Sequence, residues 1–452
     1  MFSKKNPKFL STDWLRDQLA ALIPDIEEKH LKLAYSGGMD SHVLLQLLVE
    51  LCADSRRQFT AIHVDHGLSP QSREWSRHCA AICSNIGVPL IVERVSVEVG
   101  GKGPEDAARE ARYHALTKHI LPNDVLVTAH HRDDQVETVL LHLVRGTGAH
   151  GLAGMAPVRE FAQGMHIRPL LERSRRQIED YARSRNLRWV DDASNKDTSF
   201  SRNYMRHEIV PKLRAHWPGA ERVIGRSAGH AAAAVELLEQ IAAEDWKRCG
   251  LTGVSDLNLN TCNDLGDARL RNLLRFWVFQ SGLALPATRH IDEVVRQIRK
   301  PSATGHAIIC WPGATFCRYR DRLTLQPHLE TIVNDYDIEW DTARSMTIAV
   351  LGVRVSAIRA KGRGLSAARL NGVKVHLRNR RGGEALQPVG RAHHHKLKKL
   401  FQEAGIPPWQ RDQLPLVYIN NNLAAVGDRW VSQEFAAEGN EAGLELKISK
   451  LG

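Results

Sequence analysis

The residues with the clearest chemical potential stand at positions 31–45, where an apolar segment meets a serine–glycine–glycine turn and a second apolar segment. We expect a strand, a tight turn and a helix. Glycine lacks a Cβ, so Gly37 and Gly38 would let the backbone approach a ligand closely. The following helix would offer free N–H groups and a partial positive charge to a phosphate. The run Ser36-Gly37-Gly38-Met39-Asp40-Ser41 therefore predicts phosphate binding, with an ordinary strand–helix turn as the alternative.

Two further features narrow this prediction. No Gly-Lys-Ser or Gly-Lys-Thr follows the glycines, so the turn is not a Walker P-loop. Asp40 would lie beside the phosphates, where a carboxylate is useful mainly if a metal ion balances the negative charge. Ser36 and Ser41 would add hydroxyl donors.

Polar residues also follow two other predicted strands. The strand at 59–64 contains His63 and is followed by Asp65-His66-Gly67, and the strand at 124–129 is followed by His130-His131-Arg132-Asp133-Asp134. In a parallel sheet, ligands bind beyond the carboxyl ends of the strands. These clusters therefore predict one shared site. The alternatives are a hydrogen-bonded core histidine in the first strand and a simple turn after it.

The helix predicted after the second cluster begins with paired carboxylates. Asp134 and Glu137 are three residues apart, so they share a face. Acidic residues in a first turn also complement the helix dipole, and a di-metal hydrolase is another alternative because histidine and aspartate bind metal ions. In the helix predicted at 104–121, Arg109 and Arg112 stand on neighbouring turns. They could bind a carboxylate or a phosphate, or form a solvated basic face.

The elements that must position these residues alternate along the first part of the chain. Short apolar segments recur between segments with helical spacing, which is typical of right-handed βαβ units. Such units form a parallel sheet with helices on both faces. We expect an α/β fold with strands at 31–35, 59–64, 88–95 and 124–129 and helices at 40–53, 70–86, 104–121 and 133–145.

The rest of the chain predicts a different organisation. Residues 220–300 have mostly helical patterns, and 306–326 predict short strands joined by turns. In the tail, residues 373–378 alternate as a strand does, and a helix is expected to begin near Arg391. Exposed lysines beside arginines and Trp409 favour a nucleic-acid backbone. The tail helix would bury Leu397, Leu400 and Phe401 and expose Lys396, Lys398 and Lys399.

Length and composition set the broad class. A chain of 452 residues is too long for one core, so two or three domains are expected. Its 62 Lys and Arg exceed 51 Asp and Glu, and this net charge of +11 favours a polyanionic partner, although a generally basic proteome would give the same excess. The 7 cysteines include no Cys-x-x-Cys pair and suit a reducing cytosol. No segment approaches the ~20 apolar residues of a membrane span.

Together these residues resemble one family, the tRNA(Ile)-lysidine synthetases of the N-type ATP pyrophosphatase (PP-loop) superfamily. The resemblance covers residues 31–213 and 378–416, and the region between them matches only in general layout. The pattern SGGxDS alone marks the superfamily, whereas HHxDDQxET and the tail pattern KLKKLF…IPPW make the resemblance specific. Ala193 stands where a serine is common. The matching segments are 36–41, 63–68, 107–113, 130–138, 145–152, 168–171, 191–195, 202–203, 381–384, 397–401 and 406–409.

The resemblance implies an ATP-dependent carbon–nitrogen ligase. ATP would adenylate the C2 carbonyl oxygen of the wobble cytidine in an isoleucine tRNA with a CAU anticodon, and pyrophosphate would leave. The ε-amine of free L-lysine would then attack C2, AMP would leave and lysidine would form. The implied domains are a PP-loop, adenine nucleotide alpha hydrolase-like catalytic domain at 1–218, a mostly helical tRNA-binding domain at 219–340 and a small α+β tRNA-binding domain at 341–452.

The resemblance also implies roles for individual residues. Catalytic candidates are Asp40, His130, His131 and Asp134, and the ATP site would contain Ser36, Gly37, Gly38, Met39, Asp40, Ser41, His63 and Asp65. Lysine would be held by Arg109, Arg112, Asp134 and Glu137, with general base and charge partner both open as the role of the carboxylates. Contacts with tRNA would come from Arg202, Arg206, Arg378, Arg381, Lys396, Lys398, Lys399 and Trp409. Mg²⁺ would neutralise the pyrophosphate, with Asp40 as its candidate ligand.

The expected partners are ATP, L-lysine and isoleucine tRNA, in the cytoplasm, with a homodimer as one option for the assembly. One alternative is a tRNA thiolase on the same ATP site, which would need a cysteine to carry sulfur or a cluster. Cys79 and Cys83 belong to a predicted helix, and no paired cysteines stand near the site. A second alternative is a non-catalytic RNA-binding protein. It would be expected to have lost SGGxDS or the carboxylates, and both are intact.

Overall fold

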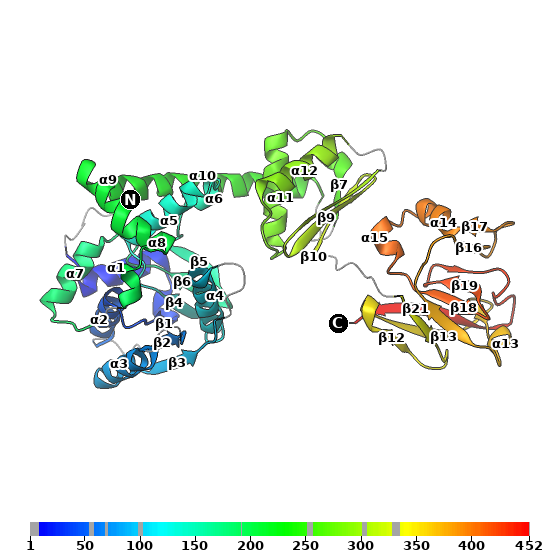
Figure 1. Cartoon of the computed structure of the whole chain (residues 1–452), viewed down its shortest axis with the longest axis horizontal. Helices are drawn as coiled ribbons and strands as arrows, with labels where there is room; N and C mark the ends of the chain where they lie inside the picture. The colour runs from blue at the N-terminus through cyan, green and yellow to red at the C-terminus, as the bar shows by residue number, and fades with distance from the viewer. Residues whose placement is uncertain are drawn as a thin grey trace. The chain divides into compact units, whose positions relative to one another are not determined.

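The structure, a computed structural model, describes residues 9–53, 58–67, 71–97, 103–190, 192–250, 256–300, 305–327 and 335–451. They form two compact units, Met1–Glu239 and Gln240–Gly452, and the boundary falls within helix α10 (Ala220–Arg248) (Figure 1). Leu68 and Asp191, which belong to predicted motifs, lie outside the described residues. The division into three domains at 218/219 and 340/341 stays a prediction.

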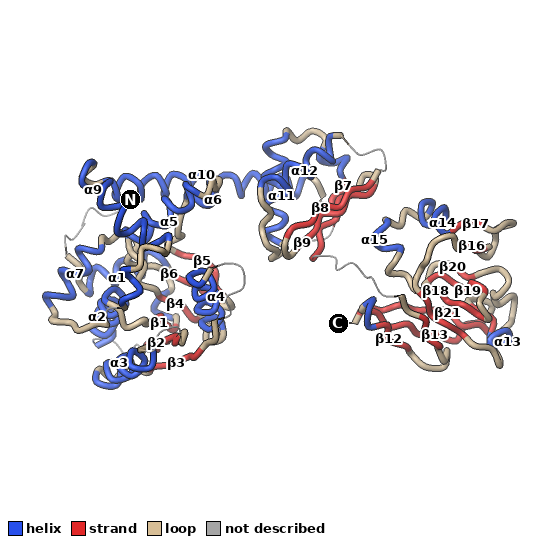
Figure 2. Tube along the Cα trace, viewed as in Figure 1, coloured by secondary structure: helices blue, strands red, loops and turns tan. Residues whose placement is uncertain are grey.

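The first unit is built on a six-stranded sheet with the order β3-β2-β1-β4-β6-β5. Neighbouring strands are parallel except for β5 and β6, which form an antiparallel hairpin. The predicted helices connect the parallel strands, so the prediction of an α/β fold is confirmed (Figure 2). The strands are β1 (His30–Ala34), β2 (Phe59–Asp65), β3 (Leu90–Arg94), β4 (Asp124–Val127), β5 (Val158–Phe161) and β6 (Gly164–Ile167).

Helices cover both faces of this sheet because side chains alternate between the faces along each strand. Leu31 and Leu33 of β1 are buried with side chains of α1, α2, α3 and α7. On the other face, Ile62 of β2 and Leu126 of β4 pack with Leu116 of α4. These helices are α1 (Thr12–Leu22), α2 (Met39–Ala53), α3 (Ser72–Asn85), α4 (Pro104–Thr117) and α7 (Arg175–Ser184).

The strand order decides where the polar clusters meet. Strand β1 lies between β2 and β4, and all three are parallel, so their carboxyl ends lie at one edge of the sheet. Helix α5 (Arg132–Val144) begins just after β4 at the same edge. The chain returns to α5 through α8 (Ser201–Tyr204), the π-helix η3 (Met205–Ile209) and α9 (Val210–His216).

The second unit contains a helix–sheet layer and a group of antiparallel sheets. The layer packs α11 (Asp267–Gln280) and α12 (Thr288–Arg299) on the antiparallel sheet β7-β10-β9-β8 around Trp277 and Phe316. The helices predicted over 220–300 and the strands predicted over 306–326 are therefore present. The four strands of this sheet are β7 (Asp256–Asn258), β8 (His306–Trp311), β9 (Ala314–Tyr319) and β10 (Arg322–Pro327).

The remaining residues form the sheets β11-β15-β18-β19-β20 and β12-β13-β21-β14, which share a core, and the small pair β16-β17. Among the described helices, none has the length and apolar character needed to cross a membrane. The strands are β11 (Asp337–Glu339), β12 (Met346–Ile348), β13 (Val353–Lys361), β14 (Leu365–Ser366), β15 (Val375–Arg378), β16 (Ala385–Leu386), β17 (His395–Lys396), β18 (Leu416–Ile419), β19 (Asn422–Val426), β20 (Trp430–Val431) and β21 (Ala442–Lys450).

The start of the tail helix differs from the prediction. Helix α14 (Leu397–Glu403) begins at Leu397 and not near Arg391. The two residues before it, His395 and Lys396, form β17, whose backbone pairs with β16, so the helix begins after them. Its predicted apolar face is correct, because Leu397, Leu400 and Phe401 are buried.

Candidate active site

The turn after β1 has the shape that its glycines predict. Gly37 has a φ of 83°, a left-handed conformation that favours glycine. The Ser36 and Ser41 hydroxyls lie 3.0 Å apart, and Ser41 Oγ accepts the Ser36 N–H at 3.2 Å. These bonds close the turn directly in front of α2, which begins at Met39. The result is a compact loop at a helix N-terminus, a geometry that suits a phosphate.

This turn opens on a cavity of about 880 Å³ in the first unit. The ends of β1, β2 and β4 and the segment that carries α8 all contribute to its lining, so the polar clusters predicted to share a site line one cavity. The lining contains the predicted site residues Ser36, Gly38, Asp40, Ser41, His63, Asp65, Arg109, Arg112, His130, Asp134, Arg202 and Arg206. Gly37, Met39, His131 and Glu137 are not among the lining residues.

Several lining residues were not predicted as site residues. Trp75 of α3 and Phe200 bring aromatic side chains to the wall, and Thr128 lies at the end of β4. Their sequence context carries no signal for this, because an aromatic residue in an amphipathic helix or a threonine in a strand has the spacing of a core residue. Of the other lining residues, Asn195 and Asn203 belong to segments that matched the family resemblance.

An ion-pair cluster joins α5 to the returning segment. Glu137 is only 1% exposed, and its carboxylate accepts Arg202 Nε at 2.9 Å and Arg206 Nε at 2.7 Å. Arg206 Nη2 also lies 3.1 Å from Asp134 Oδ1, and Arg202 Nη2 lies 3.5 Å from the same atom. Arg202 and Arg206, which were predicted to contact tRNA, thus bind the two carboxylates that were predicted to hold lysine. They do so because α8 and η3 pack against α5.

Asp134 is held on both of its oxygens. Its Oδ2 accepts the backbone N–H of His131 at 3.0 Å, which caps α5. Burial would raise the pKa of Asp134, but the charges of His131, Arg202, His130 and Arg206 lower it well below the usual range. A carboxylate with a depressed pKa is a weak base. Asp134 is therefore better suited to attract a cation than to remove a proton from it.

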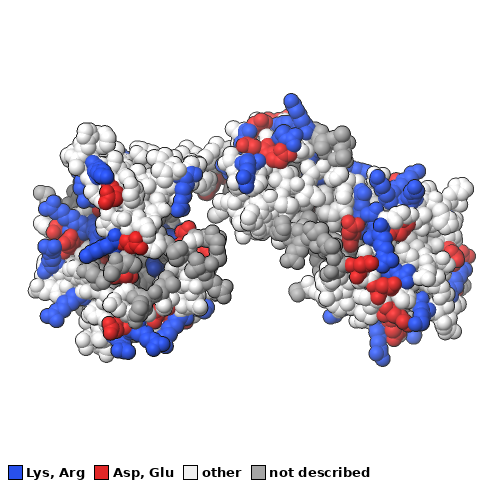
Figure 3. All heavy atoms as spheres, in the orientation of Figure 1, with Lys and Arg blue, Asp and Glu red and all other residues white. Residues whose placement is uncertain are grey.

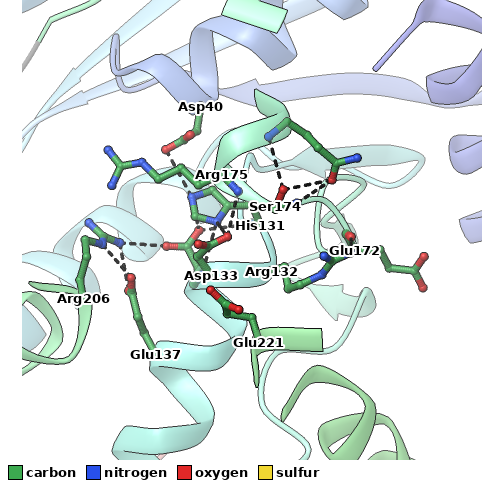
Figure 4. Close-up of polar contacts among 12 residues, drawn as sticks. Asp40, His131, Arg132, Asp133, Glu137, Glu172, Ser174, Arg175, Arg206 and Glu221 are labelled. Atoms are coloured by element: carbon green, nitrogen blue, oxygen red, sulfur yellow. Dashed lines mark hydrogen bonds and ion pairs between the residues drawn. The ribbon is translucent and has the colours of Figure 1, made fainter. Parts of the chain in front are cut away.

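His131 lies between Asp40 and the carboxylates of α5 (Figure 4). Its Nε2 is 3.4 Å from Asp134 Oδ2 and 3.6 Å from Asp40 Oδ2, and its Nδ1 is 3.8 Å from Asp133 Oδ2. Burial opposes protonation of this ring, which is 2% exposed, but the three carboxylates outweigh burial and raise the pKa of His131 to about 9. His131 thus links the phosphate turn to α5.

Asp133 points away from the cavity. Its Oδ2 accepts the Arg175 N–H at 2.8 Å (Figure 4). Its Oδ1 pairs with Arg214 Nη2 at 3.1 Å. Arg214 also pairs with Glu221 in the first turn of α10. Asp133 therefore anchors α5 to α7, α9 and α10. The sequence alone could not separate this structural role from that of Asp134, which lines the cavity.

The residues of β2 are fixed by protein contacts. His63 Nδ1 lies 2.9 Å from the Tyr35 carbonyl oxygen, and Nε2 lies 3.2 Å from Ser76 Oγ. Burial lowers the pKa of His63. This matches the alternative of a hydrogen-bonded core histidine, although the ring also lines the cavity. Asp65 accepts the Gly67 N–H at 3.0 Å. This bond is the one expected for a simple turn, which was the alternative interpretation of the residues after this strand.

The two arginines of α4, Arg109 and Arg112, also line the cavity. Arg112 Nε donates to His66 Nε2 at 3.2 Å, and the Arg109 guanidinium lies 5.2 Å from the centre of the Tyr113 ring. Burial and the Arg112 charge lower the pKa of His66 to about 4, so the imidazole is neutral and can accept this bond. Both guanidiniums line the same cavity as the Asp134–Arg206 cluster.

Asp40 fits a magnesium ion. Its Oδ1 is buried and has no hydrogen-bond partner among the described residues, while the side chain lines the cavity beside the phosphate turn. The described residues contain no group of three or more His, Cys, Asp or Glu side chains placed to hold a metal ion. Mg²⁺ usually takes one or two carboxylates and completes its shell with water and substrate phosphates. The single free carboxylate oxygen suits that mode.

Comparisons with known proteins match this architecture. A PP-loop domain profile matches residues 12–213, a TilS substrate binding domain profile matches 257–324 and a TilS substrate C-terminal domain profile matches 375–448. The tRNA(Ile)-lysidine synthase of Methylococcus capsulatus is 40% identical over 414 residues, which cover 90% of this chain and 93% of that protein. The proteins of the same name from Coxiella burnetii and Alkalilimnicola ehrlichii are each 37% identical, over 418 and 430 residues, 92% and 95% of this chain and the same shares of their own lengths.

The chain belongs to the tRNA(Ile)-lysidine synthase family. The predicted family resemblance and the PP-loop fold are therefore confirmed. The matches extend over the middle region, where the sequence resembled the tRNA(Ile)-lysidine synthases only in layout.

The predicted tail residues of this tRNA(Ile)-lysidine synthase family member differ in exposure. Arg378 is held by Asp337 Oδ2 at 2.8 Å and packs 4.9 Å from the Tyr418 ring, and Arg381 pairs with Asp335 at 2.8 Å. Trp409 is half-buried in α15 (Pro408–Arg411). Lys396, Lys398 and Lys399 are exposed around α14, in a region of the second unit where Lys and Arg side chains gather (Figure 3).

Proposed function

We propose that this protein ligates free L-lysine to C2 of the wobble cytidine in isoleucine tRNA with a CAU anticodon, using ATP. One observation carries the proposal: the phosphate turn and the Asp134–Arg202–Arg206 cluster line the same cavity in a member of this family. Adenylation of the cytidine oxygen needs ATP, and attack by lysine needs a carboxylate that holds its ammonium group. Both groups must be within reach of the same cytosine ring. A pocket of about 880 Å³ can hold a nucleotide and a second small group.

In the first step, the turn from Ser36 to Ser41 would bind the phosphates of ATP. The N–H groups at the start of α2 are the donors, and the Ser36 and Ser41 hydroxyls hold the turn in shape. A bound Mg²⁺ would neutralise the departing pyrophosphate, with Asp40 as its protein ligand. His131, whose Nε2 lies 3.6 Å from Asp40 Oδ2, would hold Asp40 in place.

In the second step, Asp134 would attract the ammonium group of lysine. Its depressed pKa supports the role of charge partner over that of general base. Asp134 lines the cavity, whereas Glu137 does not line it and is buried against Arg202 and Arg206, which supports a positioning role for Glu137 in place of direct contact with lysine. Arg109 and Arg112 remain our candidates for the lysine carboxylate, because both guanidiniums face the cavity.

For tRNA, we propose the exposed lysines around α14 as backbone contacts, with Arg381 and Trp409 beside them. The contacts of Arg202 and Arg206 support a role inside the cavity for these two residues. Substrates of this kind place the reaction in the cytoplasm, and a homodimer stays an open proposal.

The test is to incubate the purified protein with ATP, radiolabelled lysine and a transcript of isoleucine tRNA with a CAU anticodon. We expect label in the tRNA nucleoside fraction that depends on ATP. A transcript with a UAU anticodon, which lacks the wobble cytidine, is the matched control and should stay unlabelled. Equal labelling of both transcripts, or none of either, would reject the proposal.

Replacing Asp40 tests the magnesium role. Asp40→Asn keeps the shape and removes the charge, so we expect tRNA-dependent pyrophosphate release to fall by about 100-fold or more. Binding of tRNA, measured by filter retention, should change less than about twofold. Equal loss of both would count against the assigned role. Glu208→Gln, which removes a carboxylate paired with exposed Lys212, should retain most of the activity.

A further inference from the structure

A row of polar side chains runs from the β5–β6 hairpin to the cavity. Arg159 Nε and Arg168 Nη2 lie 3.2 and 3.3 Å from His166 Nδ1. His166 Nε2 lies 2.9 Å from Thr128 Oγ1, which lies 2.7 Å from His130 Nδ1. Of these five residues, Thr128 and His130 line the cavity, and His130 is the end of the row.

The sheet itself assembles this row. Strand β6 pairs with β4 and places His166 beside Leu126, two residues before Thr128. Strand β5 pairs with β6 in the opposite direction and places Arg159 directly across from His166. His166 is fully buried, and Arg168 and Thr128 are also buried. Arg159 is exposed at the outer end of the row and His130 is half-buried at the other end. Water therefore has little access to the three residues between them, whose polar groups must be satisfied within the row.

The arginines give the row a direction. A guanidinium only donates hydrogen bonds, so His166 Nδ1 must accept and carries no proton. The remaining proton of the neutral ring sits on Nε2 and is donated to Thr128 Oγ1. Thr128 has one hydroxyl proton, which it donates to His130 Nδ1. The proton of neutral His130 must then sit on Nε2.

The other arrangements fail. If Thr128 donated to His166, the His166 proton would move to Nδ1 and face the donors of Arg159 and Arg168. If both histidines donated to Thr128, its buried hydroxyl proton would lack an acceptor among the residues that the structure describes. Buried polar groups without partners are rare in folded proteins.

We infer that Arg159, Arg168, His166 and Thr128 are positioning residues that fix His130 as an Nε2–H donor, and that His130 donates this bond to an anionic oxygen of a bound substrate. Within the described part of the chain, no group hydrogen-bonds Nε2 of His130. The oxygen belongs either to a phosphoryl group of ATP or to the carboxylate of lysine, and this part of the inference rests on the proposed function. The tautomer does not depend on it.

The surroundings of His130 keep it neutral. Burial lowers its pKa to about 3, with Arg168, Arg202 and Arg109 adding to this effect and Asp134 opposing it. Burial and the charges of Arg168, Arg159 and Arg109 likewise lower the pKa of His166 to about 2. Near pH 7 the ring of His130 is thus a donor at Nε2 and cannot take up a proton at Nδ1, where Thr128 already donates.

The tautomer is tested by nitrogen NMR of the full-length protein labelled with ¹⁵N-histidine. The His130 signals are identified by their absence from a His130→Gln sample. We expect Nδ1 to resonate as an unprotonated nitrogen and Nε2 as a protonated one, with no change between pH 6 and pH 8. The reverse pattern, or a titration in this range, would overturn the inference.

Paired substitutions test the role of the donor. The amide nitrogen of glutamine can overlap His Nε2, whereas that of asparagine overlaps Nδ1. His130→Gln should keep activity within about tenfold, and His130→Asn should lose about 10²–10³-fold, the usual effect of removing a donor to a developing oxyanion. Equal loss in both variants would reject a donor at Nε2.

Thr128 tests the positioning. Thr128→Val removes the hydroxyl at constant shape and should lower kcat about 10-fold, with the protonated-Nε2 signal reduced, while Thr128→Ser restores both. A Thr128→Val enzyme with normal kcat and an unchanged His130 spectrum would overturn the inference.

The KM values of His130→Asn identify the oxygen that accepts the bond. A selective rise in KM for ATP indicates a phosphoryl oxygen, and a selective rise in KM for lysine indicates its carboxylate. A His130→Asn enzyme with unchanged kcat and KM values would reject substrate contact. If the wild-type protein fails to incorporate lysine but shows the expected tautomer, the proposed function fails and the tautomer stands.

Discussion

At the scale of single residues, Gly37 has two separate reasons to be glycine. Its φ of 83° is rarely adopted by other residues, and a Cβ built on it would lie 2.7 Å from Cys79 Sγ of α3. The first reason concerns the backbone, and the second concerns packing against a buried thiol. Gly38 differs, because its Cβ would meet only Ser36 Oγ, at an ordinary 3.5 Å.

Gly37→Ala should therefore destabilise the first unit by about 1–3 kcal/mol in urea unfolding. Adding Cys79→Ala removes the thiol and should recover part of that loss, while the backbone strain remains. Gly38→Ala is the matched control and should change stability by less than about 0.5 kcal/mol, even if it impairs ATP use. A fully additive double variant would show that the contact with Cys79 is not important.

For His63, Asp133 and Asp134, residue spacing could not separate a structural role from a role in the site. The two interpretations of His63 were both consistent with one histidine in an apolar strand, and only the Tyr35 carbonyl and Ser76 hydroxyl decide that its ring is hydrogen-bonded within the protein. Asp133 and Asp134 are adjacent and identical in type. Helix geometry turns them about 100° apart, so one faces the cavity and the other anchors neighbouring helices.

At the scale of elements, Glu137 joins α5 to α8 and η3. Its buried carboxylate is held by Arg202 and Arg206, so removing its charge leaves two guanidiniums partly uncompensated. We expect Glu137→Gln to destabilise the first unit by about 3–5 kcal/mol, measured by urea unfolding. Glu208→Gln, which breaks an exposed pair with Lys212 in the same segment, should cost less than about 0.5 kcal/mol. Similar small effects in both variants would contradict the role of the cluster.

The β5–β6 hairpin makes the first unit sensitive to acid. His166 has a folded-state pKa of about 2, below the 6.5 expected when unfolded. Its contribution to stability is present above pH 6.5 and is lost as pH falls below that value, because only the unfolded state then binds the proton.

We therefore expect the free energy of unfolding to fall between pH 6.5 and pH 5, by roughly 1–2 kcal/mol from His166. His166→Gln does not titrate and should have a correspondingly smaller pH slope, whatever its absolute stability. Urea unfolding at several pH values gives the slopes. Identical slopes in the two proteins would show that His166 is protonated in the folded state.

At the scale of the whole molecule, the positive charge has a proposed use in binding tRNA. Lys398→Ala together with Lys399→Ala should weaken tRNA binding and flatten the dependence of log K on log salt by roughly one to two units, about 0.7–0.9 for each lost phosphate contact. Filter binding over a range of salt concentrations measures this. Lys361→Ala with Lys447→Ala, which removes exposed lysines from β13 and β21 of the same unit, is the control. An unchanged slope in the α14 variant would exclude this helix from the RNA surface.

The sequence by itself determined the parallel α/β layout, the phosphate turn and the exposed lysines around α14. Each depends on residues that are neighbours along the chain, so periodicity and glycine placement were sufficient. The tertiary structure alone decided that Arg202 and Arg206 pair with carboxylates 65 to 72 positions away, that Cys79 lies against Gly37, and that His166 connects Arg159 to Thr128. Charge and hydrogen-bonding capacity are visible in a sequence, but the partner that satisfies them is chosen by the packing of distant elements.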